Sequence, residues 1–209
     1  TKISLGFALM LLLVVILGGN SFTSLQSSKK NTEEIDQANE RLILEMKIEN
    51  EFKTGVAAIR GFIAYGDEKY FKQVEETMAN TIEMENQLLK LTREEKKPEV
   101  QNLIKVTTQY RDGLINQLSP VVRSYHKELA AGNGEKARAY GAEMNAIARG
   151  LIPLTDQLTK TIQTLVKENT EIVNSSLDSS KKDANRVITV SLIITIIAIL
   201  IGILLSVFL

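Results

Sequence analysis

Two uncharged apolar runs lie near the ends of the chain, and every charged residue except Lys2 lies between them. The first run extends from Ile3 to Gly19, and the second, 23 residues long, extends from Val187 to Leu209. About 20 apolar residues of helix, at ~1.5 Å per residue, cross the ~30 Å hydrocarbon core of a bilayer. The pattern therefore predicts transmembrane helices over residues 1–22 and 187–209, with a polar domain over residues 23–186 on one side of the membrane.

Apolar residues within this polar domain recur at intervals of three and four, the spacing of one face of an α-helix. We predict a first helix that leaves the membrane and continues to about Ala64, a second over residues 68–95, a third from Pro98, and a fourth that follows residues 131–134 and runs into the second span. The predicted core positions on these helices are Ile48, Phe52, Val56, Ile59, Ile63, Phe71, Val74, Met78, Ile82, Leu89, Val100, Leu103, Thr107, Tyr110, Leu114, Leu118, Val121, Tyr125, Leu129, Leu151, Leu158, Leu165 and Ile172.

The residues between the helices are typical of short turns. Gly66 suits a left-handed helix C-terminus, Asp67 suits an N-cap, and Pro98 suits the first turn of a helix. Short turns join antiparallel neighbours, so the predicted fold is all-α: an antiparallel up-down four-helix bundle flanked by two transmembrane helices. Pro120 and Pro153 fall inside helical patterns, where we expect kinks.

Composition excludes several classes of function. The chain has 25 basic and 25 acidic residues, so no basic excess indicates a nucleic-acid partner. It has no Cys and only one His, His126, which argues against a metal site. No nucleophile, phosphate-binding or metalloprotease motif is present, and the paired carboxylates are adjacent in sequence, so they point in different directions on a helix. We therefore predict no enzymatic activity, no catalytic residues, no cofactor and no metal.

Two segments resemble a known family. Residues 60–70 (RGFIAYGDEKY) and 129–137 (LAAGNGEKA) are similar to the first and third turns of the four-helix-bundle sensor domain of bacterial methyl-accepting chemotaxis receptors. The resemblance covers the whole chain. It implies an extracytoplasmic sensor with both flanking spans in a two-pass protein of the bacterial cytoplasmic (inner) membrane. Signalling would occur by a small displacement of helix four and the second span, and cytoplasmic signalling domains would follow Leu209.

Other interpretations of the chain remain open. Sensor domains of membrane histidine kinases carry a similar first turn, and a structural or partner-docking membrane bundle would need no small ligand. The first run is longer than a signal-peptide core and shows no clear small-x-small site before Ser27, so an uncleaved anchor is preferred. Lys2 favours a cytoplasmic N-terminus, whereas Lys181, Lys182 and Arg186 precede the second span on the presumed outer side.

A group of aromatic and basic residues near the first and third turns forms the candidate ligand site. Arginine offers a carboxylate two parallel hydrogen bonds, and tyrosine offers its carbon skeleton a ring. A small organic anion or an amino acid is the expected ligand, although the same surface would suit a ligand-loaded binding protein. The candidate residues are Arg60, Tyr65, Tyr125, His126, Arg138 and Tyr140.

This site has a plain alternative. Carboxylates near the same turns would pair with every cation there, leaving ordinary packing at the end of a bundle; they are Asp67, Glu68, Glu128, Glu135 and Glu143. In aspartate-type receptors of the chemotaxis family, arginines at the dimer interface, chiefly on helix one, bind the ligand, and only Arg60 has a comparable position on helix one here. His126 is the one side chain that ordinarily titrates near neutral pH, so it is either a pH sensor or a surface histidine.

The resemblance also implies a homodimer, associated through helices one and four and embedded in membrane lipid. Gly6, Gly18 and Gly19 would permit close contact between helices in the bilayer.

Overall fold

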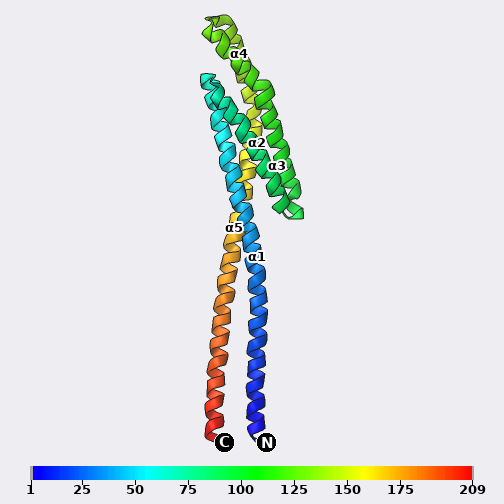
Figure 1. The fold of residues 1–209 in the computed structure, drawn as a ribbon, viewed down its shortest axis with the longest axis vertical. Coiled ribbons are helices and arrows are strands. Elements are labelled where there is room, and N and C mark those ends of the chain that lie inside the picture. Colours follow the sequence, from blue (N-terminus) through cyan, green and yellow to red (C-terminus); the bar gives the residue numbers. More distant parts are fainter. Residues whose placement is uncertain (1, 209) are drawn as a thin grey trace. The chain divides into compact units, whose positions relative to one another are not determined.

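The computed structural model describes the backbone of residues 2–208 and the side chains of residues 8, 11, 12 and 14–204. The described residues form helices and short turns without any strand, which confirms the predicted all-α class (Figure 1). The helices are α1 (Lys2–Tyr65), α2 (Glu68–Leu91), a short 3₁₀ turn η1 (Glu94–Lys96), α3 (Lys97–Asp112), a π-helical turn η2 (Gly113–Leu118), α4 (Ser119–Ala130) and α5 (Gly134–Phe208).

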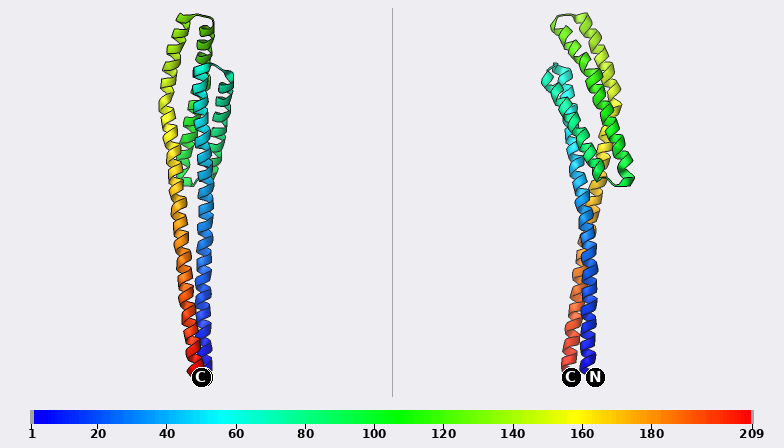
Figure 2. Two further views of the ribbon diagram at one scale, coloured as in Figure 1. Left: turned by 90° about the vertical axis from the view of Figure 1, so that its left-hand side faces the viewer. Right: turned by 45° about the vertical axis from the view of Figure 1, so that its right-hand side comes forward.

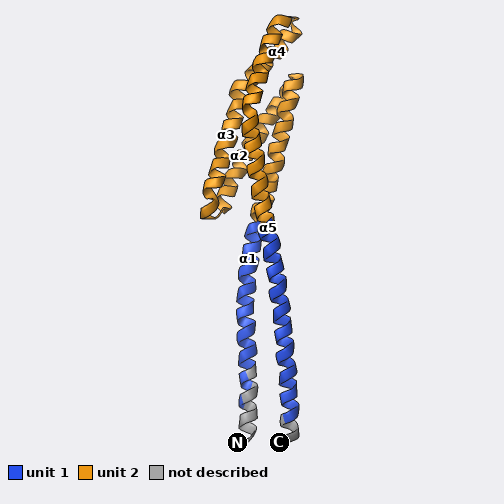
Figure 3. Cartoon of the chain, turned by 180° about the vertical axis from the view of Figure 1, so that it is seen from behind, with its two compact units in different colours: residues 1–38, 171–209 blue, residues 39–170 orange. Residues whose placement is uncertain are grey.

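The chain divides into two compact units, residues 39–170 and residues 1–38 with 171–209 (Figure 3). In residues 39–170, which we call the bundle, four helical segments run alternately up and down: α1, α2, the continuous stretch of α3, η2 and α4, and α5 (Figure 2). Buried apolar residues from all four segments form one core, with Phe62, Met78, Leu118 and Leu158 among its fully enclosed members.

The predicted turn residues behave as expected. Gly66 ends the first segment at φ 65°, in the left-handed region that favours glycine, and its N–H donates to the Phe62 carbonyl at 2.8 Å. The Asp67 carboxylate accepts from the Lys69 N–H at 2.9 Å as the N-cap of α2, and Pro98 lies in the first turn of α3.

The first and third turns lie at different levels of the bundle. Figures 1 and 2 show that the α4–α5 turn extends beyond the α1–α2 turn. Gly66 lies beside His126, so residues of α4 after His126 have passed the end of the α1–α2 pair. The prediction that Leu129 belongs to the core is therefore wrong, and its side chain is 53 % exposed.

Helix α2 buries the predicted Phe71, Val74 and Met78, but beyond Met78 its buried residues differ from the predicted ones. Its enclosed residues after Met78 are Thr81, Glu85 and Leu88, whereas the predicted Ile82 and Leu89 are only half-buried. α2 also ends at Leu91 rather than near residue 95, because Thr92 is extended at φ −80° and ψ 139°. Five more predicted core residues lie at the margin of the bundle core, half-buried but packed against it: Val56, Ile63, Val121, Tyr125 and Leu151.

A π-helical turn precedes Pro120, where a kink is predicted. The Ser119 N–H donates to the Leu114 carbonyl, five residues back instead of four, and Pro120 then occupies the first turn of α4. A proline cannot donate to the carbonyl four residues earlier and its ring crowds that group, so a widened turn at this point accommodates it. At Pro153 the backbone of α5 is helical on both sides.

The second unit consists of the beginning of α1 and the end of α5, which run side by side. The Asn31 amide donates to the Asp183 carboxylate at 3.4 Å between the two segments. Within α5 an 18-residue stretch has a mean hydropathy of 3.1 with none of it buried, the composition of a membrane-crossing helix. It is the one helix among the described residues that meets this test. Much of the first predicted span, including the side chains of residues 1–7, 9, 10 and 13, lies outside the described residues.

Candidate functional site

The residues around Gly66 form an ordered aromatic cluster. The His126 ring nitrogen Nε2 lies 3.0 Å from the Ile63 carbonyl oxygen, and the ring meets Tyr125 edge-on with centroids 5.0 Å apart. Tyr65 stacks on Tyr70 with centroids 5.9 Å apart, and its side chain is 71 % exposed. Tyr125 in turn lies against Gly141 of α5. Three of the six candidate residues, Tyr65, Tyr125 and His126, are therefore near this turn, and Tyr140 is adjacent in sequence to Gly141.

Part of the cationic charge near this turn is already paired. Arg123 donates to both carboxylate oxygens of Glu68, at 2.6 and 2.9 Å, and its guanidinium lies 4.3 Å from the centroid of Phe71. Lys69 pairs with Asp67 at 3.1 Å. For Arg123 and Lys69, these contacts agree with the alternative of ordinary ion pairs at the end of the bundle. Arg60 and Arg138 differ, since they form no ion pair in the part of the chain that the structure describes.

Arg60 and Arg138 lie far apart. Arg60 lines a groove between α1 and α5 together with Thr155 and Asp156. Arg138 is 17 residues from Thr155 along α5, which corresponds to ~26 Å at ~1.5 Å per residue. A small ligand cannot span that distance, so one site cannot contain both arginines.

The groove around Arg60 has a volume of about 360 Å³ and contains charges of both signs. Lys53 donates to Glu49 at 2.7 Å, so these two residues neutralise each other. Arg60 and Asp156 remain, and neither forms an ion pair among the described residues. The residues that line the groove are Glu49, Phe52, Lys53, Val56, Ala57, Arg60, Thr155, Asp156, Thr159 and Ile162. The groove therefore offers one cation, one anion and an apolar floor, while the hydroxyls of Thr155 and Thr159 already donate to helix carbonyls.

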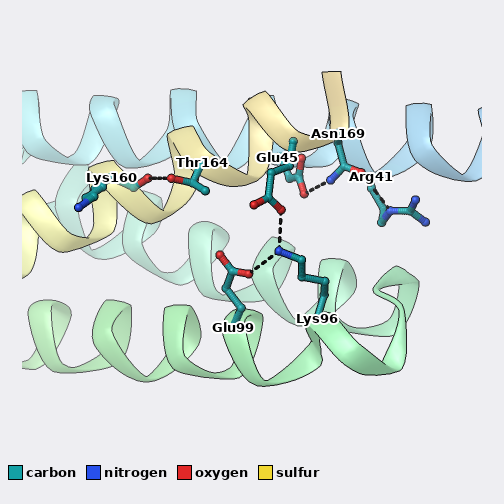
Figure 4. A network of polar contacts seen from close by, with 8 residues as sticks. Arg41, Glu45, Lys96, Glu99, Lys160, Thr164 and Asn169 are labelled. Atoms are coloured by element: carbon teal, nitrogen blue, oxygen red, sulfur yellow. Dashed lines mark hydrogen bonds and ion pairs between the residues drawn. The ribbon is translucent and has the colours of Figure 1, made fainter. Parts of the chain in front are cut away.

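A second polar site is buried between α1 and α5 (Figure 4). The Asn169 amide donates to the Glu45 carboxylate oxygen Oε1 at 2.7 Å, and Arg41 Nε lies 3.5 Å from the Asn169 carbonyl oxygen. Glu45 is 2 % exposed, and its second oxygen has no partner among the described residues. Burial raises the pKa of Glu45 to about 7, although the Asn169 amide and the Arg41 guanidinium act in the opposite direction.

Lys96, the last residue of η1, forms ion pairs with carboxylates of α5 and α3. Its ammonium group donates to Glu168 of α5 at 2.7 Å and to Glu99 of α3 at 3.2 Å (Figure 4). Arg41 also donates from Nη1 to the Leu91 carbonyl at the end of α2, at 3.4 Å. Hydrogen bonds from these charged groups thus connect α1 to α2 and α3 to α5 within the bundle.

A third polar site lies between α2 and α3. Glu85 is 0 % exposed, and its Oε1 lies 2.6 Å from the Thr107 hydroxyl oxygen. Its Oε2 has no hydrogen-bond partner among the described residues. Burial raises the pKa of Glu85 to about 7, and no charged side chain contributes to that change.

Sequence reasoning missed both buried carboxylates because it assigned inward positions by apolarity. A signal was nevertheless present: Glu85 follows Met78 by seven residues and Glu45 precedes Phe52 by seven, so each shares a helical face with a core residue.

Comparisons of the chain with protein families, with curated proteins and with solved structures find no match.

Proposed function

We propose that the chain is the ligand-sensing, membrane-anchored part of a signalling receptor. The supporting observation is the continuity of α5, which contributes Thr155 and Asp156 to the groove and includes the exposed apolar stretch. A ligand that contacts α5 in the bundle would act on the same helix that enters the membrane. Packed helices shift by ~1–2 Å in known switching transitions, so a shift of this size in α5 would carry the effect of ligand binding to the membrane.

The proposal places both apolar runs in the bacterial cytoplasmic membrane as two spans, with the bundle outside and the protein as a homodimer. The similarity of residues 60–70 and 129–137 to chemotaxis-receptor turns favours that class over the sensor of a histidine kinase. The topology is tested by placing a cysteine at Asn133, an exposed turn residue in a chain without native cysteine. We expect a membrane-impermeant thiol reagent to label it in intact cells; labelling only after lysis would refute the topology.

The ligand we propose is a small zwitterion of the amino-acid type, bound in the α1–α5 groove. Arg60 would hold the carboxylate and Asp156 the ammonium group, and the two charges of the groove would then both be paired. A dianion would instead bring excess negative charge next to Asp156, which like-charge repulsion disfavours. Of the six candidate residues, Arg60 lines the groove, whereas five do not: Tyr65, Tyr125, His126, Arg138 and Tyr140.

Calorimetry on the 209-residue chain in lipid nanodiscs, with a panel of amino acids, their deaminated analogues and dicarboxylates, tests the proposal. We expect an amino acid to bind more tightly than its deaminated analogue. Arg60→Ala and Asp156→Asn should each weaken binding roughly ten- to a hundredfold, the loss of one charge-assisted hydrogen bond at ~1.5–3 kcal/mol.

Arg138→Ala is the matched control, because it removes the same charge from an exposed site ~26 Å along α5 from Thr155. Its affinity should equal that of the unmodified chain. Equal losses in Arg60→Ala and Arg138→Ala would place the ligand elsewhere, and a panel in which nothing binds would remove the small-molecule function.

A further inference from the structure

Glu85 occupies a position in the bundle core where an ionised carboxylate is poorly accommodated. It is fully enclosed, and its Oε2 has no donor within reach among the described residues. The hydroxyls nearest along α2 are committed elsewhere: Thr81 donates to the Thr77 carbonyl at 2.8 Å, and Thr77 donates to the Gln73 carbonyl at 2.7 Å. An ionised carboxylate normally accepts several hydrogen bonds, and one left without them in an apolar core is costly.

The Thr107 hydroxyl can form hydrogen bonds with both of its oxygen neighbours only when the Glu85 carboxyl carries a proton. The Thr107 hydroxyl oxygen lies 2.6 Å from Glu85 Oε1 and also 3.0 Å from the Leu103 carbonyl oxygen. A hydroxyl has a single hydrogen, so Thr107 can donate to only one of these oxygens. If Glu85 donates to Thr107 through its own O–H, Thr107 donates to Leu103 and both short contacts become hydrogen bonds. If Glu85 is ionised, one of the two contacts has no hydrogen.

We propose that Glu85 is a proton-binding site of the bundle core, occupied in the packed state and emptied as the solution becomes alkaline, so that the packing of α2 against α3 responds to pH. This function is separate from ligand binding in the α1–α5 groove. The groove lies between α1 and α5, whereas Glu85 and Thr107 belong to α2 and α3. Failure of either proposal leaves the other intact.

The electrostatic surroundings agree with this assignment. Burial raises the pKa of Glu85 from 4.5 to about 7 against the opposing hydrogen bond from Thr107, and no charged side chain contributes to this shift. The folded chain therefore holds the proton between about pH 4.5 and 7, where the unfolded chain has released it. The stabilisation is complete below this window, decreases as the pH rises through it and is gone above it. Within it, the folding equilibrium constant should fall by up to about tenfold per pH unit.

Infrared titration of the 209-residue chain in lipid nanodiscs tests the site directly. The band of protonated carboxyl groups should disappear with a midpoint near pH 7, and Glu85→Gln, which mimics the protonated form in shape and charge, should remove part of that change. Glu45→Gln should remove a separate part, since Glu45 titrates in the same range. Glu76→Gln, an exposed glutamate on the same helix, is the matched control and should leave the titration near pH 7 unchanged.

Thr107→Val provides a second test that does not alter the carboxyl. Valine has nearly the shape of threonine but no hydroxyl, so it removes both the acceptor of the protonated carboxyl and the donor to the ionised one. The bond to the ionised form is charge-assisted and is therefore the stronger of the two. The Glu85 midpoint should therefore move to higher pH. An unchanged near-neutral titration in Glu85→Gln, or a chain without any protonated carboxyl at pH 6, would overturn the proposal. So would a midpoint that stays fixed or moves to lower pH in Thr107→Val.

Discussion

The first and third turns each contain a glycine with a positive φ angle, but only the glycine of the first turn is crowded by a neighbouring side chain. Gly66 and Gly132 have φ of 65° and 76°, a region that alanine occupies only at a cost. A Cβ on Gly66 would lie 2.5 Å from His126 Cγ, whereas a Cβ on Gly132 would meet nothing within 4 Å. The pair of substitutions Gly66→Ala and Gly132→Ala therefore separates backbone strain from steric collision.

The expected magnitudes follow from these two contributions. Gly132→Ala should lower the free energy of unfolding by ~1–2 kcal/mol, the cost of left-handed backbone for a residue with a Cβ. Gly66→Ala carries the same cost and must also displace His126, which contacts the Ile63 carbonyl and packs against Tyr125. Overpacking of this kind typically adds ~1–3 kcal/mol, so a total of ~2–5 kcal/mol is expected.

Denaturant unfolding of the 209-residue chain in detergent, followed by far-ultraviolet circular dichroism, measures both changes. A third variant combines Gly66→Ala with His126→Ala and is compared with His126→Ala alone. The difference in the free energy of unfolding between these two should contain the backbone cost of Gly66→Ala but not the cost of the collision with the His126 ring. Equal destabilisation in Gly66→Ala and Gly132→Ala would refute the close packing of the α1–α2 turn against α4.

The same unfolding assay checks three further predictions. Phe62→Ala should cost ~3–5 kcal/mol because Phe62 is 0 % exposed, whereas Leu129→Ala should cost less than ~0.5 kcal/mol; similar values would contradict the assigned core. Gly113→Ala should change the free energy of unfolding by less than ~1 kcal/mol, because a gain of ~1 kcal/mol in helix propensity offsets the displacement of Leu151 Cδ2, the flexible end of a half-buried side chain 2.5 Å from the new Cβ; a loss above ~3 kcal/mol would contradict this. Because the pKa of Glu45 is raised to about 7, the folded chain binds a proton there more strongly than the unfolded chain, and the free energy of unfolding falls as the pH rises from about 4.5 to 7. Glu45→Gln should make this fall less steep by up to ~1.4 kcal/mol per pH unit. An unchanged dependence of the free energy of unfolding on pH would contradict the prediction.

The helical fold could be predicted because its signals are local. Apolar spacing, the left-handed Gly66, the N-cap Asp67 and Pro98 each act within a few residues, and the structure contains the helices and turns that they predict. The relative lengths of the α1–α2 and α4–α5 hairpins, in contrast, do not follow from local sequence signals. Whether Leu129 meets a partner depends on how far α1 and α2 extend beside α4, and no residue near Leu129 encodes that length.

The candidate site could be predicted only in part for the same reason. Distance from the nearest turn places Arg60 and Arg138 in one layer, but Arg60 lies in the groove with Thr155, and Arg138 is 17 residues further along α5. The buried polar sites escaped prediction because burial of a carboxylate depends on its neighbours. Glu85 is enclosed where α2 packs against α3, and apolar spacing predicts Thr107 as a core position but not the carboxyl that it contacts.

Transmission of ligand binding to the membrane-proximal helices is the central claim, and crosslinking tests it most directly. Asn31 and Asp183 contact each other between α1 and α5 in the unit that contains both apolar runs, and the chain has no native cysteine. The measurement is the rate of disulfide formation between cysteines at these two positions, in nanodiscs, with and without the zwitterion that calorimetry identifies. We predict that saturating ligand changes this rate and that Arg60→Ala abolishes the change at the same ligand concentration. A ligand that binds the groove while the rate stays constant would contradict the account.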